Sequence, residues 1–73
     1  MLISKIAAQI AALRPDCSDY VYLTPTVRVM VEGDDYVVSQ WDPNAGTVTH
    51  EVLTCTIPSA AAIAARLIES ARN

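Results

Sequence analysis

The chain has 73 residues, of which 52% are hydrophobic and 18% charged, and its formal net charge is −3. This composition excludes a disordered chain, and the length predicts a single domain over residues 1–73. No apolar run reaches the ~18–20 residues that a membrane-spanning helix needs, so a membrane is not expected as a partner.

The charge is unevenly distributed along the chain. Residues 1–15 carry two basic side chains and no acidic one, whereas residues 16–57 carry seven acidic side chains against one basic. A negative field repels the phosphates of nucleic acids and attracts basic protein surfaces. We therefore expect no direct binding to nucleic acid, and we expect a protein with a basic surface as the partner.

Large apolar residues recur at helical spacing in the first segment and predict an amphipathic helix that Pro15 ends. Lys5 and Gln9 interrupt the apolar run, so a secretory signal is not expected. Cys17 and Cys55 have no spacing that indicates a disulfide and fit free thiols in a reducing cytoplasm. The helix would bury Leu2, Ile3, Ile6, Ile10 and Leu13, and its other face carries Ser4, Ala7, Ala8, Ala11 and Ala12.

Alternating valines next predict a strand over residues 27–32. Before it, Pro25 interrupts the pattern, so Tyr20–Leu23 is either a short edge piece or a lead-in to the strand. Gly33-Asp34 is typical of a two-residue hairpin turn. The hairpin that this turn closes would pair Glu32 with Asp35, Val31 with Tyr36 and Val29 with Val38.

The next turn signal lies at Asp42–Gly46. Treated as a five-residue loop, it sets a register that keeps Val48 and Val52 on the inward face of the sheet. The following strand would continue through residues 53–57. The register would pair Trp41 with Thr47, Val38 with His50 and Tyr36 with Val52.

The last segment, IPSAAAIAARLIESARN, predicts a second amphipathic helix with Pro58 at its start. The element order is α-β-β-β-α in the α+β class. We expect a three-stranded antiparallel meander with both helices on one face, because each helix has one apolar stripe to bury. The stripe of the second helix would consist of Ala60, Ile63, Ala64, Leu67, Ile68 and Ala71, with Ala61, Ala62 and Ala65 behind it.

The helix-free face of this sheet is the candidate binding surface. Trp41, Met30 and Val37 are expected there, and exposed aromatic and methionine side chains ringed by polar residues are typical of contact patches. The alternative is that Trp41 folds under a loop or packs beneath one of the nearby tyrosines. The predicted partner-binding residues are Trp41, Met30, Val37, Glu32, Asp34, Asp35, Asp42, Glu51, Tyr20 and Tyr22.

The residues that could carry chemistry do not form a recognisable site. His50 is the single histidine, so it lacks the partner that a general base needs, and its spacing from Cys55 matches no zinc motif. Cys55 is expected to pack as a small apolar residue. The turn carboxylates lie at opposite ends of one strand and would diverge. We therefore expect no catalytic residues, no metal, no cofactor and no enzymatic activity.

The α-β-β-β-α order that ends in the alanine-rich helix SAAAIAARLIES resembles double-stranded-RNA-binding domains. In that family the second helix begins with a lysine cluster that binds phosphate. Here the matching positions are Pro58, Ser59, Ala60 and Ala61, none of which is basic. RNA binding is therefore not expected.

In character, a compact acidic domain of this kind resembles small phage-encoded inhibitors of host nucleic-acid machinery, such as anti-CRISPR proteins. That resemblance implies a protein-binding module that occupies a positively charged groove in the cytoplasm of a bacterial host. The acidic side chains would steer association and Trp41 would anchor it. The alternative is an assembly protein that forms a homodimer or larger oligomer through Ala7, Ala8, Ala11, Ala12, Ala61 and Ala65.

Overall fold

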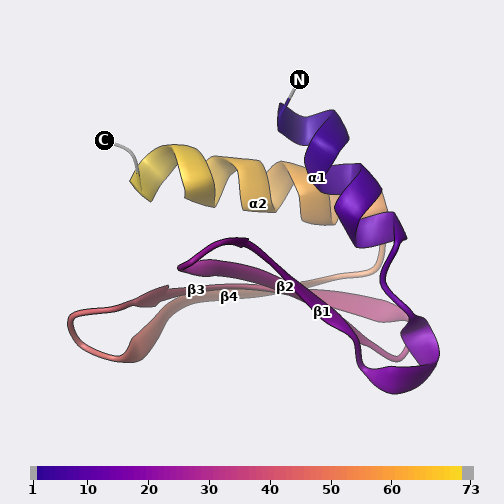
Figure 1. Cartoon of the computed structure of the whole chain (residues 1–73), viewed down its shortest axis with the longest axis horizontal. Coiled ribbons are helices and arrows are strands. Elements are labelled where there is room, and N and C mark those ends of the chain that lie inside the picture. Colours follow the sequence, from indigo (N-terminus) through magenta and orange to yellow (C-terminus); the bar gives the residue numbers. More distant parts are fainter. Residues whose placement is uncertain (1, 72–73) are drawn as a thin grey trace.

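In the computed structural model, which describes residues 2–71, two α-helices lie over one face of a four-stranded antiparallel sheet (Figure 1). The expected α+β class is confirmed. The side chains of Leu2 and Ala71, which the sequence places on the apolar stripes, lie outside the described part. The elements are helix α1 (Leu2–Ala11), the short 3-10 helix η1 (Pro15–Cys17), strands β1 (Tyr20–Thr24), β2 (Val27–Glu32), β3 (Asp35–Asp42) and β4 (Thr47–Thr54), and helix α2 (Ile57–Ala71).

The sheet has one strand more than the sequence predicts. Residues Tyr20–Thr24 pair with β2 at the sheet edge, so the edge-piece interpretation of this segment is confirmed and the three-stranded count is wrong. The connection is tight because the Thr24 hydroxyl accepts hydrogen bonds from the backbone N–H of Thr26, at 3.2 Å, and of Val27, at 3.1 Å. Pro25 has no N–H to donate to a ladder and therefore fits in this turn.

The β2–β3 hairpin has the predicted register. Glu32 pairs with Asp35, Val31 with Tyr36 and Val29 with Val38. Gly33 has a φ of 64°, which the first position of this two-residue turn requires and which glycine adopts without steric cost.

The β3–β4 hairpin differs from the prediction. Asp42 pairs directly with Thr47, so the loop has four residues, and Val48 lies opposite Trp41 on the helix-free face. A register irregularity between Gln40 and Trp41 then shifts the pairing by one residue. This bulge brings Val52 opposite Val38, so Val52 returns to the helix side as predicted.

The turn residue Asp42 explains the shorter loop. Its Oδ1 accepts hydrogen bonds from the N–H of Asn44, at 2.9 Å, and of Ala45, at 3.4 Å. The Gly46 N–H also donates to the Asp42 carbonyl oxygen at 2.7 Å. These bonds close the turn at Asp42, so the β3 ladder ends at Asp42, whereas a five-residue loop would end it at Trp41.

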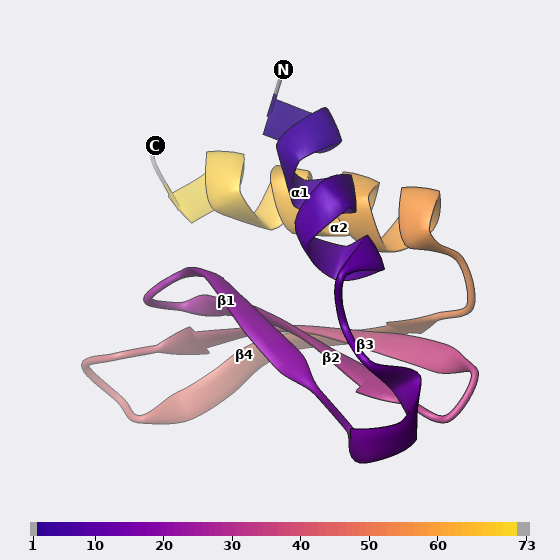
Figure 2. The same ribbon diagram turned by 45° about the vertical axis from the view of Figure 1, so that its right-hand side comes forward.

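The hydrophobic core lies between the helices and the upper face of the sheet (Figure 2). Helix α2 runs over β2 and β3, and α1 packs mainly on α2 with further contacts to β1. Both helices therefore cover the same face, as expected. The largest fully buried side chains are Ile6, Ile10, Val27, Val29 and Val38.

Ala60, Ala64 and Ile68 of the predicted α2 stripe are buried, as expected. Ala61 and Ala65, predicted behind the stripe, are both buried, whereas Ile63 and Leu67 pack at its flanks. The prediction was wrong here because it assumed that the largest side chains mark the buried centre. Where two helices pack closely together, small side chains fit the contact better.

Candidate functional site

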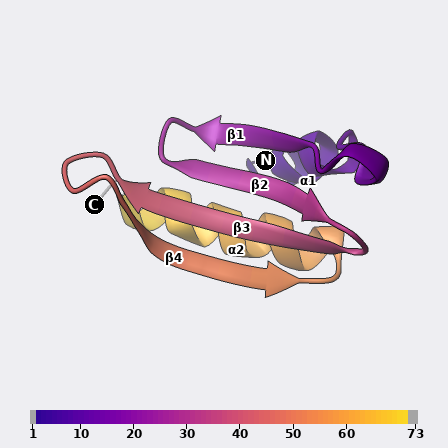
Figure 3. The same cartoon turned by 90° about the horizontal axis from the view of Figure 1, so that it is seen from below.

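The helix-free face of the sheet, here named the open face, is the candidate functional site. Figure 3 shows it from below, with the four strands side by side and both helices behind them. Residues paired across antiparallel strands share a face. The strand registers therefore place two rows on the open face: Tyr20, Met30, Val37 and Leu53 in one, and Tyr22, Arg28, Ser39 and Glu51 in the other.

Exposed apolar side chains gather on this face. Of the seven large hydrophobic side chains that are exposed within the described residues, five lie there, and only Ile3 and Val52 do not. An exposed apolar cluster of this kind marks an interaction surface more often than chance exposure. The five are Tyr20, Tyr22, Trp41, Val48 and Leu53.

Side chains in the middle of the open face are less exposed to solvent than those at its flanks. Val37 and Ser39 project from the central strand β3 but are only 7% and 8% exposed. The prediction that Val37 is open to solvent was therefore wrong, because longer side chains on β2 and β4 cover it. At the β1 edge of the open face the side chains pack on one another. The Tyr20 and Tyr22 rings meet edge to face with centroids 5.8 Å apart, and the Arg28 guanidinium carbon lies 5.6 Å from the Tyr20 ring centroid.

Trp41 combines the two interpretations that the sequence left open. Its indole N–H donates to the Pro25 carbonyl oxygen at 3.1 Å, so the ring is tied to the β1–β2 turn. Its side chain nevertheless remains 43% exposed on the open face. Trp41 is thus both a clamp between β3 and the β1–β2 turn and a part of the exposed aromatic surface.

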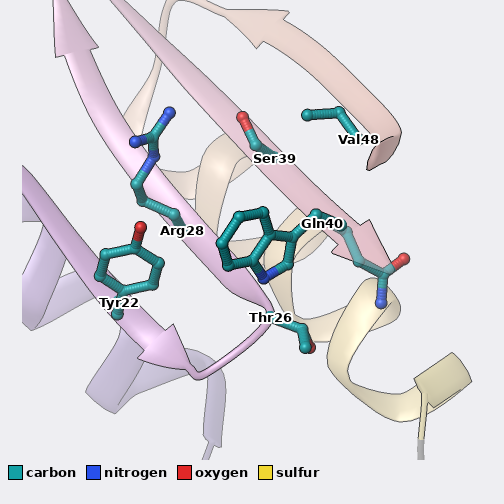
Figure 4. A pocket seen from close by; sticks show the side chains of 7 residues that line it. Tyr22, Thr26, Arg28, Ser39, Gln40 and Val48 are labelled. Atoms are coloured by element: carbon teal, nitrogen blue, oxygen red, sulfur yellow. The ribbon is translucent and has the colours of Figure 1, made fainter. Parts of the chain in front are cut away.

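A pocket of ≈ 240 Å³ lies beside Trp41 (Figure 4). Arg28 and Tyr22 form one side of it, and Ser39 lies between Arg28 and Val48, which belongs to the neighbouring strand β4. Arg28 also borders a neighbouring hollow of ≈ 290 Å³. Three apolar and two acidic side chains complete the lining of that second hollow: Met30, Val37, Leu53, Glu32 and Glu51.

The predicted acidic residues surround the open face without converging on one point. Glu32, Asp34 and Glu51 are exposed, whereas Asp35 and Asp42 are half-buried. The Asp42 carboxylate is also engaged in its own turn. The open face therefore has carboxylates at the β2–β3 turn, on β4 and at the β3–β4 turn, with Arg28 as the basic side chain between them.

The remaining chemically reactive residues stay apart. His50 is exposed on β4, where its Nδ1 lies 3.3 Å from the Thr49 hydroxyl. Cys17 and Cys55 are free and exposed, so the expected packing of Cys55 is wrong, because β4 ends at Thr54. Within residues 2–71 no three metal-ligating side chains come together. No helix in the same range is long and apolar enough to cross a membrane.

Four residues that the predicted partner-binding set did not include belong to the site: Arg28, Ser39, Val48 and Leu53. The alternation from Val52 on the helix side could have placed Leu53 on the open face. Val48 lies there because the β3–β4 loop has four residues and not five, and nothing in the sequence pattern indicated the bulge that returns Val52 to the helix side. No protein-family model, curated protein or solved structure matches the chain.

Proposed function

We propose that the chain is a non-catalytic protein-binding module that contacts its partner with the open face. The observation that carries the proposal is the gathering of five exposed large apolar side chains on the one sheet face that no helix covers. Aromatic side chains and arginine are enriched among the residues that dominate binding energy. Tyr20, Tyr22, Trp41 and Arg28 supply both kinds.

The charge of the open face favours a partner with a basic surface. Carboxylates of Glu32, Asp34 and Glu51 are exposed around the apolar patch. Such rim charges accelerate association with a positively charged partner and disfavour negatively charged ones. The finer proposal is an inhibitor that covers the nucleic-acid-binding surface of another protein.

A helix-mediated homo-oligomer is the less favoured proposal. Ala61 and Ala65 are buried inside the monomer, and Ala7 packs against the core. Of the alanines predicted for this interface, Ala8 and Ala11 of α1 and Ala12 just after it remain exposed. Mass measurement at micromolar concentration distinguishes the two proposals: a stable dimer through the helices favours assembly, and a monomer favours the open face.

Two matched variants test the proposed function. Leu53 on the open face is 62% exposed and Ile3 on α1 is 50% exposed, so arginine at either position costs little core packing. We would use the wild-type chain, Leu53→Arg and Ile3→Arg as baits in a bacterial lysate and identify retained proteins by mass spectrometry.

The proposal expects a protein that wild type and Ile3→Arg retain and that Leu53→Arg loses. Both variants add the same charge, so a general electrostatic effect would act on both alike. If Leu53→Arg retains the protein and Ile3→Arg releases it, the open face is not the binding surface.

A further inference from the structure

The pocket beside Trp41 contains a buried hydroxyl that has no partner. Ser39 is 8% exposed, and its Oγ makes no hydrogen bond in the described structure. A buried hydroxyl left unpaired costs roughly 1–3 kcal/mol, and such groups are uncommon enough to need an explanation. Because Ser39 lines the pocket, a ligand atom in the pocket can supply the missing partner.

The other polar groups of the lining show what kind of atom would fit. The Trp41 indole N–H is bonded to Pro25, and the Gln40 amide donates to the Leu67 carbonyl oxygen of α2 at 3.3 Å. Figure 4 shows the Gln40 amide turned away from the other lining side chains. The Thr26 hydroxyl lies 3.4 Å from the Thr24 hydroxyl. The other polar side chains that line the pocket, Tyr22, Arg28 and Ser39, each carry a group that can donate a hydrogen bond. The pocket therefore suits a ligand that accepts hydrogen bonds.

The walls and the charge narrow the ligand class further. The Trp41 ring and Val48 form an apolar side, and ≈ 240 Å³ is below the range of typical drug-sized sites, so the space suits one side-chain-sized group. Arg28 favours an anion, but Glu51 pairs with Ser39 from the next strand. With Arg28 and Glu51 both nearby, the pocket accommodates the single negative charge of a carboxylate better than the double negative charge of a phosphate.

We propose that this pocket binds a carboxylate carried on a small apolar group, supplied by the partner protein. The inference rests on the proposed function and adds the chemistry of one partner residue. Arg28 and Ser39 donate to the carboxylate, and Trp41 and Val48 contact the attached carbon atoms. Docking of one acidic group inside an otherwise basic partner surface fixes the orientation of the complex.

Trp41 allows a direct test because it is the only tryptophan and it lines the pocket. Its fluorescence would be followed while the chain is titrated with phenylacetate or with phenylacetamide, which has the same ring but no charge. We expect saturable binding of phenylacetate that is at least about tenfold tighter than that of phenylacetamide, since a charge-assisted hydrogen bond is worth about that factor.

Four variants test which residues account for the binding of phenylacetate. Arg28→Met keeps the aliphatic part of the side chain and should weaken phenylacetate binding about tenfold or more, and Ser39→Ala should weaken it several-fold. Glu51→Gln removes a like charge and should tighten it. Arg66→Gln, on the exposed surface of α2, is the matched control and should leave it unchanged.

Equal affinity for phenylacetate and phenylacetamide would overturn the inference, as would an unchanged affinity in Arg28→Met or a lack of saturable binding by phenylacetate. Failure of this inference is distinguishable from failure of the proposed function. If phenylacetate does not bind but Leu53→Arg still releases a protein that Ile3→Arg retains, only the pocket assignment is wrong. If phenylacetate binds as expected but Leu53→Arg retains the partner, the pocket is a carboxylate site and the protein contact lies elsewhere.

Discussion

Replacement of Trp41 separates its structural role from its exposure. A packed tryptophan buries about 150–250 Å², and Trp41 is 43% exposed, so roughly 85–140 Å² of it is covered. At about 25 cal/mol per Å² this burial contributes about 2–3.5 kcal/mol. The bond from the indole N–H to the Pro25 carbonyl oxygen adds about 1 kcal/mol.

We therefore expect Trp41→Ala to lower the free energy of unfolding by about 3–4.5 kcal/mol, and Trp41→Phe by about 1–1.5 kcal/mol. A core of this size supplies only ~3–5 kcal/mol in total, so the alanine variant should be marginally stable and have a substantial unfolded fraction at room temperature. Binding measurements on it would report unfolding and not contact loss, which is why Leu53 is the better position for them.

The assay is urea denaturation followed by far-ultraviolet circular dichroism, which does not depend on the indole. Leu53→Ala is the control, because this side chain is 62% exposed and should lose less than about 1 kcal/mol. A loss below about 1 kcal/mol in Trp41→Ala would refute the clamp between β3 and the β1–β2 turn. Equal losses in the alanine and phenylalanine variants would show that the N–H bond, and not burial, accounts for the effect.

Other variants test individual features of the fold. Ser39→Ala should raise the free energy of unfolding by about 0.5–1.5 kcal/mol in urea denaturation, because it removes an unpaired buried hydroxyl; a loss of stability would mean that Oγ has a partner in solution. Gly33→Ala should cost about 1–2 kcal/mol, because φ there is 64°, and an unchanged midpoint would contradict the turn geometry. A thiol reagent should label both Cys17 and Cys55 in the native protein as fast as in urea, and protection of either would contradict its exposure.

The sequence predicts best where one local signal decides the structure. Gly33 fixes a two-residue turn, and the valines on either side then admit one register that buries them. In the next hairpin the sequence leaves the loop length undecided, because Asp42 and Gly46, at the two ends of the segment, both favour a turn. The Asp42 carboxylate shortens the loop to four residues, and a bulge opposite the Gln40–Trp41 step compensates for the resulting shift.

The candidate site was only partly predictable for a related reason. Alternation places Val37 and Ser39 on the open face, but their burial depends on the longer side chains of the neighbouring strands. The pairing of Tyr22 with Arg28 could not be inferred either, because the edge strand itself was uncertain. Likewise, Ala61 and Ala65 become buried through the packing of α1, which no pattern within α2 indicates.

The central claim is that the partner covers the open face and leaves the helices free. Nuclear magnetic resonance of the labelled chain with and without the partner retained on the wild-type bait tests it directly. The side-chain signals of Tyr20, Tyr22, Arg28 and Leu53 should shift or broaden, while those of Ile3 and Ala8 on α1 stay in place. Changes confined to α1 with the open-face signals unmoved would contradict it.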